Sequence, residues 1–463
     1  MEISLVSPVC SILKSRATTL LVILFGLLIS GSLSAQQRIV GYYAAYKAST
    51  LPYNNVEYSN LTDINVAFAY PNANGSLGYI DPGMPFPQLV SAAHAAGVKV
   101  LISLGGAANS TFFPDVTADS SGRATFINNI VLFLTTNNYD GVDIDWETPT
   151  NTQQTAQLTA LVREMRARFN QVQPAWLITM AVPATSYGGQ HFDYASLTPN
   201  VDWYNVMCYD FVGSWVQYAG HDSPLYQASN DPNRAGSDST AIYYNISRGI
   251  PKNKLVLGVP FYGDVFAAAG LYQKGTWTGN TIYSGVMSYI ASGWTYHWDS
   301  VSAVPYLTNP GSTQFLTFED TNSVRLKTEF SVRQGLGGIM IWELSQDLYD
   351  GRQPLLETIA NATRELTGVQ ASPITVRSFR LYDNYPNPFN PTTAIRYRLP
   401  AVSYVTLKVY DVLGRQVAVL VNARQNPGTY AATFDGIGLA SGVYFYRLEA
   451  GANAAVGKMV LLK

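Results

Sequence analysis

The sequence predicts an α/β protein, a (β/α)8 TIM barrel with a small α+β insertion, followed by an all-β immunoglobulin-like sandwich. The first observation is size: 463 residues with 47% hydrophobic side chains can bury a large core but exceed one ordinary domain. The second is a series of eight short apolar runs that alternate with helical patterns. The third is a change near Thr367, after which apolar residues recur at every second position.

The eight runs are rich in Val, Ile and Leu, and most are bounded by Gly, Pro or Asn, which is typical of buried parallel strands. Apolar residues at three-and-four spacing indicate helices between several of them, over residues 86–96, 123–136 and 155–169. A doubly wound open sheet is the alternative, but no glycine-rich phosphate loop follows the first run. The expected strands are residues 39–44, 63–69, 98–104, 141–145, 177–182, 201–208, 255–261 and 338–342.

The connection from Gly263 to about Thr317 is aromatic and rich in turn residues. A structureless loop of that length is unusual in a compact domain. We therefore expect an inserted subdomain at residues 264–317, beside the mouth of a barrel domain that spans residues 36–368.

Prolines in the segment 383–391 break regular structure, and five period-two runs follow it. Turns at Gly414 and Gly442 separate some of these runs. They predict a small antiparallel sandwich over residues 383–463, joined to the barrel by a linker at residues 369–382. The runs are residues 394–399, 405–410, 416–420, 429–434 and 443–448.

The amino-terminal segment has the order of a secretory signal peptide. Lys14 and Arg16 precede an apolar run at residues 20–29, and small residues follow it, so we expect a signal peptide over residues 1–35. The apolar run is about half as long as a bilayer span requires. Without this segment Cys208 is the remaining cysteine, and no internal disulfide is expected.

The charge balance excludes a nucleic-acid binder. Lys and Arg total 29 and Asp and Glu total 31, so no basic surplus exists to contact phosphates. A neutral chain with many Tyr and Trp side chains suits an uncharged partner such as a carbohydrate. The 4 histidines are scattered without ligand spacing, so we expect neither a metal site nor a cofactor.

The strongest local signal is the acidic run from Asp140 to Glu147. Strand side chains alternate, so Asp143, Asp145 and Glu147 share one face, which in a barrel is the interior. Crowded carboxylates raise one another's pKa, and Glu147 comes last, at the end where barrel active sites lie; it is the natural general acid. An exposed acidic loop is disfavoured by the alternating apolar residues. A hard-cation site stays open, although nothing else in the chain completes it.

The motif Asp140-x-x-Asp143-x-Asp145-x-Glu147 resembles the signature of glycoside hydrolase family 18, the chitinase family. Four further blocks resemble that family's third, sixth, seventh and eighth strands and occur in the same order. The resemblance covers residues 37 to 365 or so, and it implies a barrel fold and glycosidase activity. The blocks are residues 103–106, 207–210, 255–263 and 337–343.

The resemblance implies retaining hydrolysis without an enzyme nucleophile. Glu147 would protonate the glycosidic oxygen and later serve as the base for water, while the substrate's own acetamido carbonyl attacks the anomeric carbon to form an oxazolinium ion. Asp145 would bind the acetamido N–H and share a proton with Asp143. Tyr209 would donate its hydroxyl to the acetamido oxygen.

The same resemblance makes Trp342 the apolar floor beneath the sugar, although core packing is the usual role of such a residue. Asp210 is expected to bind substrate or to cap the next loop. Core packing is likewise the alternative for the other expected substrate contacts, which are Tyr42, Phe68, Met207 and Trp215.

Two positions depart from the family pattern. Ala107 follows the Gly-Gly pair of the third strand, where many members have Trp. Asp264 follows the seventh-strand block, which often continues with Arg. Both changes concern the binding groove, and neither touches the acid residues.

The carboxyl-terminal domain resembles the sorting domain of the type IX secretion system. The resemblance implies that the secretion machinery is a partner and that the protein is exported across an outer membrane, to the cell surface or the medium. A carbohydrate-binding sandwich is the alternative. The matching segments are residues 384–391, 409–415, 441–444 and 458–463.

From these observations we expect a secreted, monomeric chitinase that binds chitin and chitooligosaccharides and hydrolyses β-1,4-linked N-acetylglucosamine polymers. One alternative is an endo-β-N-acetylglucosaminidase that acts on glycoprotein glycans. The other is a non-catalytic chitin-binding lectin, which the presence of Glu147 disfavours.

Overall fold

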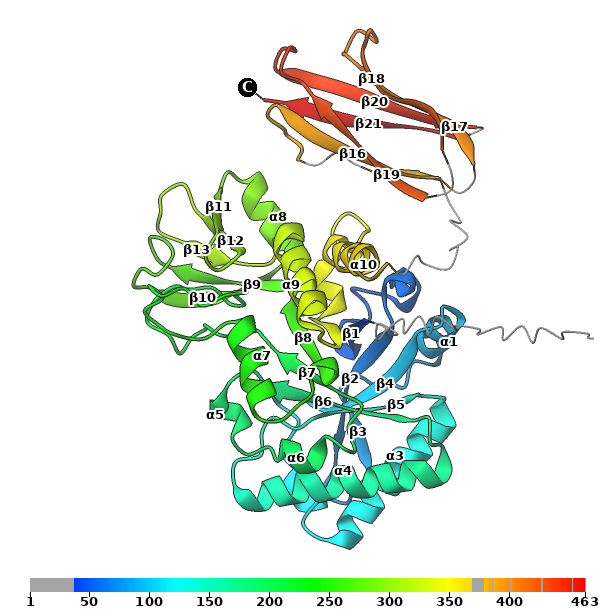
Figure 1. The fold of residues 1–463 in the computed structure, drawn as a ribbon, viewed down its shortest axis with the longest axis vertical. Coiled ribbons are helices and arrows are strands. Elements are labelled where there is room, and N and C mark those ends of the chain that lie inside the picture. Colours follow the sequence, from blue (N-terminus) through cyan, green and yellow to red (C-terminus); the bar gives the residue numbers. More distant parts are fainter. Residues whose placement is uncertain are drawn as a thin grey trace, which may run out of the picture.

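The fold was analysed in a computed structural model (Figure 1). It describes residues 37–368 and residues 379–462 apart from positions 383, 385, 400, 401, 426, 427 and 452. The expected signal peptide and most of the expected linker lie outside the described residues.

Eight parallel strands form a closed barrel, as the sequence predicts. The first strand pairs with both the second and the last, which closes the sheet, and β3 (Leu77–Tyr79) adds to β2 in the antiparallel direction. The expected strand limits differ from the observed ones by at most two residues. The barrel strands are β1 (Arg38–Ala44), β2 (Asp63–Pro71), β4 (Lys99–Gly105), β5 (Gly141–Asp145), β6 (Leu177–Pro183), β7 (Trp203–Met207), β8 (Leu255–Pro260) and β14 (Gly338–Trp342).

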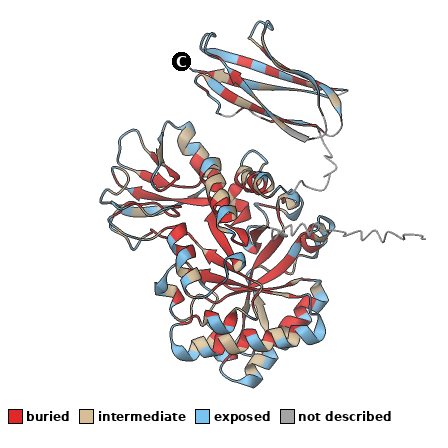
Figure 2. Ribbon diagram, viewed as in Figure 1, coloured by how far each residue is buried: buried red, intermediate tan, exposed pale blue. Residues whose placement is uncertain are grey.

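Helices surround the barrel, and their exposed faces contrast with the buried strands in Figure 2. Side-chain caps set several starts: Asp119 accepts from the backbone N–H of Ser121, and Asp320 forms a capping box with Ser323. The longer helices are α1 (Pro87–Ala95), α3 (Ser120–Asn137), α4 (Thr152–Val172), α7 (Asp238–Ser247), α9 (Thr321–Gln334) and α10 (Pro354–Thr367); the short ones are α2 (Phe113–Val116), α5 (Ser186–Gly189) and α6 (Tyr194–Leu197).

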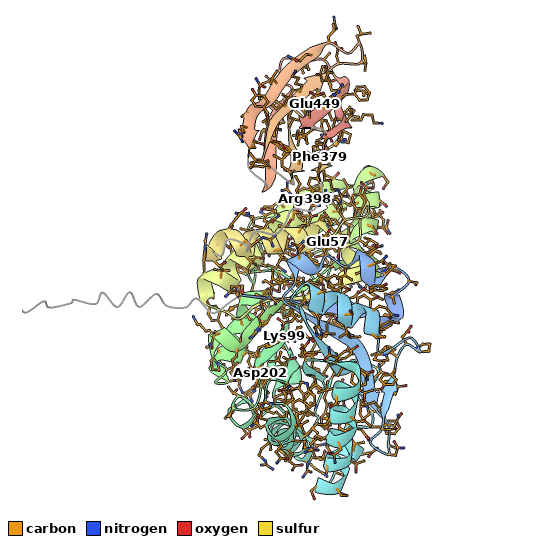
Figure 3. The ribbon with its side chains drawn as sticks, turned by 90° about the vertical axis from the view of Figure 1, so that its right-hand side faces the viewer. Glu57, Lys99, Asp202, Phe379, Arg398 and Glu449 are labelled. Atoms are coloured by element: carbon orange, nitrogen blue, oxygen red, sulfur yellow. The ribbon has the colours of Figure 1, made fainter. Side chains whose placement is uncertain are left out.

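Strand alternation divides the barrel into two environments. Val142 and Ile144 of β5 face the helices and join the large apolar core. Asp143 and Asp145 of the same strand face the interior, where they are buried. In Figure 3, Lys99 and Asp202 mark the amino-terminal ends of β4 and β7, at the end of the barrel opposite to Asp145.

The long connection between β8 and α9 folds into an α+β unit. Its sheet has five antiparallel strands in the order β10-β9-β13-β12-β11, and β9 continues almost directly from β8. The unit comprises β9 (Tyr262–Ala267), β10 (Thr276–Ile282), α8 (Tyr283–Ala291), β11 (Thr295–Asp299), β12 (Val304–Thr308) and β13 (Phe315–Thr317).

The carboxyl-terminal domain has two antiparallel sheets around a separate apolar core, as expected. The sequence analysis missed two strands, because β15 has only two residues and β21 is diluted by Ala and Gly. Among the described residues no helix has the length and apolar character needed to cross a bilayer. The sheets are β15 (Arg380–Leu381), β16 (Thr392–Leu399) and β19 (Gly428–Asp435), then β18 (Gln416–Gln425), β17 (Ser403–Tyr410), β20 (Gly442–Ala450) and β21 (Asn453–Leu461).

Candidate active site

A cavity of about 290 Å³ opens at the carboxyl-terminal end of the barrel strands. It gathers most of the residues expected from the sequence, from segments far apart in the chain. Two expected residues do not line it: Trp215, which is 64% exposed, and Asp143, which is buried. The expected residues that do line it are Tyr42, Phe68, Asp145, Glu147, Met207, Tyr209, Asp210 and Trp342.

Asp143 lies beneath the cavity and accepts four hydrogen bonds. Its Oδ2 accepts from the Tyr42 hydroxyl (2.6 Å) and the Ser103 hydroxyl (2.8 Å). Its Oδ1 accepts from the Thr179 hydroxyl (2.6 Å) and Asn205 Nδ2 (3.0 Å). Burial raises the pKa of Asp143, whereas these four donors lower it, so the carboxylate is held by a complete set of partners.

Ser103, Thr179 and Asn205 were not among the expected site residues. Each lies on a different barrel strand, in the otherwise apolar run that predicted the strand. Ser103 and Thr179 are in register with Asp143 on its two neighbouring strands. A polar residue inside an apolar strand is the sequence signal that could have identified them.

Asp145 and Glu147 lie two residues apart and both line the cavity. Burial, followed by the charges of Glu147 and Asp143, raises the pKa of Asp145 well above its ordinary value. Burial also raises the pKa of Glu147, and the charge of Asp210 adds to this effect. The mutual hydrogen bond of the two carboxyls raises the pKa of Asp145 further, while it lowers that of Glu147 against the effect of burial. Within the described residues Asp145 Oδ1 has no hydrogen-bond partner.

Glycines at the end of β4 allow a close approach to β5. Gly105 has φ of +115°, and a Cβ atom there would lie 2.2 Å from the Asp145 carbonyl oxygen. Gly106 has φ of +85°, and its Cβ would lie 2.8 Å from the Phe68 ring. The Gly-Gly pair therefore permits both the backbone contact and the aromatic wall.

Ser110 is another residue that the sequence analysis missed. Its hydroxyl oxygen accepts a hydrogen bond from the backbone N–H of Glu147 at 3.0 Å. The same hydroxyl donates to the carbonyl oxygen of Gly106 at 3.1 Å. Ser110 thereby connects the loop after β4 to the backbone of the acid residue.

The remaining walls are aromatic. The Trp342 ring stacks with Phe68 at 5.7 Å between centroids and meets Tyr42 edge-on at 5.4 Å. Burial and the neighbouring carboxylates raise the pKa of Tyr209 well above its ordinary value, so its hydroxyl remains a donor. Residues not expected from the sequence also line the cavity, namely Tyr46, Ile80, Ala108, Asn109 and Ala181.

Ala107 lines the cavity as well, where its methyl group offers no ring for stacking on a sugar. Asp210 lies at the cavity wall with φ of +54° and accepts a hydrogen bond from the Tyr262 hydroxyl. Asp210 therefore contacts both the cavity and the inserted α+β unit.

The acidic run is not an exposed loop, because Asp143 and Asp145 are buried within β5; that alternative is wrong. In the described part of the chain, no group of three or more His, Cys, Asp and Glu side chains is arranged to hold a metal ion. Cys208 is buried and unpaired, consistent with a small core residue.

A barrel with a pair of carboxyls in a cavity at the carboxyl-terminal ends of its strands is typical of a glycoside hydrolase. Residues 38–347 match the model of glycosyl hydrolases family 18, and the chain belongs to this family. Residues 383–462 match the model of a secretion system C-terminal sorting domain.

The chain is similar to Chitinase A1 of Niallia circulans, at 30% identity over 67% of this chain and 56% of that protein. It is also similar to a probable endochitinase of Caenorhabditis elegans, at 34% identity over 59% of this chain and 48% of that one. The chain thus spans about half the length of these curated relatives.

Solved structures of chitinases are also similar to this chain. The Group IV chitinase of Ostrinia furnacalis, in complex with allosamidin, has a TM-score of 0.67 and 25% identity over 71% of this chain and 99% of that one. Catalytic domain 2 of the Group II chitinase from the same insect has a TM-score of 0.67 and 27% identity over 73% of this chain and 98% of that chain.

Proposed function

We propose that this protein is a secreted chitinase that hydrolyses β-1,4-linked N-acetylglucosamine polymers by a retaining, substrate-assisted mechanism. The observation that carries the proposal is the pair of carboxyls, Asp145 and Glu147, that lines the cavity at the ends of the barrel strands, with the pKa of each raised by burial. A protonated carboxyl near neutral pH is what a general acid requires. Relatives named as chitinases support the substrate class.

Glu147 is the proposed acid and base. Its raised pKa favours the protonated form, which donates to the glycosidic oxygen as the bond to the leaving sugar breaks. The resulting carboxylate then accepts a proton from the water that opens the oxazolinium ion. The same group thus serves both steps, and neither step needs a protein nucleophile.

Asp145 is proposed to orient the substrate's acetamido group. Its buried Oδ1 has no partner among the described residues and is available to accept the acetamido N–H. A negative Asp145 also stabilises the positive charge that develops on the ring and the oxazolinium nitrogen. Asp143, held by its four donors, lies on the same face of β5 and shares a proton with Asp145 when that side chain turns.

Other residues that line the cavity are proposed to hold the substrate in position. The Tyr209 hydroxyl donates to the acetamido oxygen, which directs this oxygen toward the anomeric carbon. Trp342, stacked against Phe68, forms an apolar surface beneath the sugar ring. Asp210 and Met207 line the same cavity and are proposed substrate contacts. Tyr42 acts mainly through its hydrogen bond to Asp143.

Export is proposed to proceed through the type IX machinery, with the sorting domain as the recognised element, and the enzyme is proposed to act as a monomer outside the cell. The family model that matches residues 383–462 supports this route. The barrel, at residues 36–368, is the proposed catalytic domain, with the insertion at residues 264–317.

The test is product analysis with purified mature protein, residues 36–463. Chitohexaose is the substrate, with cellohexaose and a mannose-rich N-glycan beside it. Cleavage of chitohexaose alone supports a chitinase, and release from the N-glycan would move the assignment to an endo-β-N-acetylglucosaminidase. Binding of chitohexaose without cleavage of any substrate would make the protein a lectin.

A matched variant separates binding from chemistry. Glu147→Gln keeps the shape of the side chain but cannot donate the proton, so binding should persist while turnover falls by about 10²–10⁴-fold. Isothermal titration with chitohexaose measures binding, and product release measures turnover. Turnover near that of the unchanged protein would refute the role of Glu147.

A further inference from the structure

Two buried carboxyls outside the acidic run lie in direct contact. Asp222 is 2% exposed and lies in the loop after β7, and Asp264 is 4% exposed and lies on β9. The backbone N–H of Asp222 donates to Thr317 Oγ1 at 3.1 Å, and Thr317 is paired with Asp264 across β13 and β9, which brings the two carboxyls together. Two ionised carboxylates this close in a buried site would repel each other, so their surroundings favour one proton between them. Trp277 Nε1 donates to Asp264 Oδ1 at 2.7 Å, whereas Asp222 Oδ2 has no other donor among the described residues.

The pair supports one wall of the cavity. The backbone N–H of Asp210 donates to Asp222 Oδ1 at 2.9 Å, and Asp210 has the left-handed backbone conformation noted above. The Asp210 carboxylate accepts from Tyr262, which lies two residues before Asp264 on β9. Asp222 therefore holds the backbone of Asp210, and the strand of Asp264 holds its side chain.

The segment that carries Asp222 is anchored on both sides. His221 Nε2 lies 3.1 Å from the carboxylate of Asp299 in the inserted unit. The Ser223 hydroxyl accepts from the buried Lys327 ammonium at 2.7 Å. Three consecutive buried residues thus connect the inserted unit, the cavity wall and α9, which leaves Asp222 little freedom to move away from Asp264.

The charges around the pair favour retention of its proton. Burial, then the charges of Asp264 and Asp210, raise the pKa of Asp222 well above its ordinary value. Burial raises the pKa of Asp264 to about 6. Lys327 is the cation that acts against this effect on Asp222. Its ammonium is already paired with two other buried carboxylates, those of Asp238 and Glu319.

Tyr262 completes the surroundings of the pair. Burial, then the carboxylates of Asp222 and Asp210, raise the pKa of Tyr262 well above its ordinary value, so its hydroxyl stays a donor to Asp210. Asp210 is in turn the charged neighbour that raises the pKa of Glu147. The buried pair is thus linked to the acid by the hydrogen bonds that hold Asp210 and by the charge of Asp210.

We propose that Asp222 and Asp264 share one proton at neutral pH and act as positioning residues that fix Asp210 and Tyr262 in the cavity wall beside Glu147. Neither residue of the pair lines the cavity, and the pair acts through the backbone of Asp210. Loss of the proton would place two negative charges in contact and push the Asp210 loop away from β9. The effect on catalysis rests on the proposed function, whereas the shared proton does not.

The first test measures stability against pH in the mature chain. Asp222→Asn supplies a permanent amide donor for Asp264 and keeps an oxygen for the Asp210 N–H. In the unchanged protein the pKa of Asp222 is higher in the folded state than in the unfolded chain. The free energy of unfolding therefore falls as pH rises from the unfolded pKa toward the folded pKa. The melting temperature of Asp222→Asn relative to the unchanged protein should therefore increase steadily from pH 5 to pH 8. A melting-temperature difference that does not change with pH would overturn the proposal that the pair shares a proton. This measurement does not depend on enzyme activity, so it is independent of the proposed function.

The second test measures kcat and KM with chitohexaose. Asp222→Ala removes the acceptor for the Asp210 N–H and should lower kcat/KM by about tenfold, whereas Asp222→Asn should stay within about threefold. Asp299→Asn is the matched control, because Asp299 contacts His221 but not the pair. Equal loss in Asp222→Asn and Asp222→Ala, or no loss in Asp222→Ala, would overturn the positioning role. If Asp222→Ala does not fold, the comparison of Asp222→Asn with Asp299→Asn decides, and a loss larger in Asp222→Asn counts against the proposal.

Discussion

The fully buried Lys327 provides a stringent test of how the barrel is stabilised next to its active site. Its ammonium lies 2.7 Å from Glu319 and 3.0 Å from Asp238, and none of the three side chains is more than 2% exposed. It also donates to the carbonyl oxygen and the hydroxyl of Ser223. A single buried ammonium group is thus the charge partner of two carboxylates and the hydrogen-bond donor to two oxygen atoms of Ser223.

Lys327→Met keeps most of the side-chain volume but leaves both carboxylates without a cation. Breaking a buried ion pair by removal of one partner costs about 3–5 kcal/mol of unfolding free energy. For a domain of this size that loss corresponds to a melting temperature about 4–7 °C lower. The pKa of Asp238 is already raised to about 7, mainly by burial, and that of Glu319 is also raised.

The pH dependence follows from the sign of these shifts. When the pKa of a carboxyl is higher in the folded protein than in the unfolded chain, the free energy of unfolding falls as pH rises from the unfolded pKa to the folded pKa. Without Lys327 the folded pKa values of Asp238 and Glu319 rise further, so the loss should be greatest above pH 7 and smaller near pH 5.

The assay is thermal and urea unfolding of the mature chain at both pH values. The triple variant Lys327→Met, Asp238→Asn, Glu319→Gln is the control, because it removes the uncompensated charges together with the cation. It should be more stable than Lys327→Met alone. A loss below about 1 kcal/mol in Lys327→Met, or the same loss at both pH values, would refute the reasoning.

Other predictions concern the site and export. Asp143→Asn should lower kcat by at least about tenfold and reduce stability, because an amide has one acceptor atom for four donors; kinetics and melting curves measure both. Gly106→Ala should lower activity through displacement of Phe68, visible as a higher KM for chitohexaose; an unchanged KM would contradict this. Tyr209→Phe should reduce kcat with little change in binding by titration. Deletion of residues 377–463 should leave the purified enzyme active but retained in the cell envelope, as fractionation would show; normal secretion of the truncated chain would argue against the sorting role.

Local patterns in the sequence were sufficient for much of the fold. All eight barrel strands were predicted within two residues, because buried parallel strands are short runs of apolar residues with clear boundaries. The acidic face of β5 was predictable for a similar reason. Because side chains of a strand alternate between its two faces, Asp143 and Asp145 lie on the same face of β5 in any fold that keeps this strand.

The sequence did not predict which side chains from distant segments contact each other. The four donors to Asp143 come from four other strands, and a polar residue within an apolar run has no visible partner until the barrel closes. The exposure of Trp215 likewise depends on how its loop packs, since an aromatic residue can serve a core, a groove or a surface.

The sequence by itself therefore determined the barrel strands and the inward acidic face, because strand periodicity is a local property of the chain. Only the tertiary structure decided that Asp222 accepts from the backbone of Asp210 while Tyr262 of β9 donates to the Asp210 side chain. A contact of this kind depends on where the barrel and its insertion bring two backbones together, and no spacing in the sequence encodes that distance.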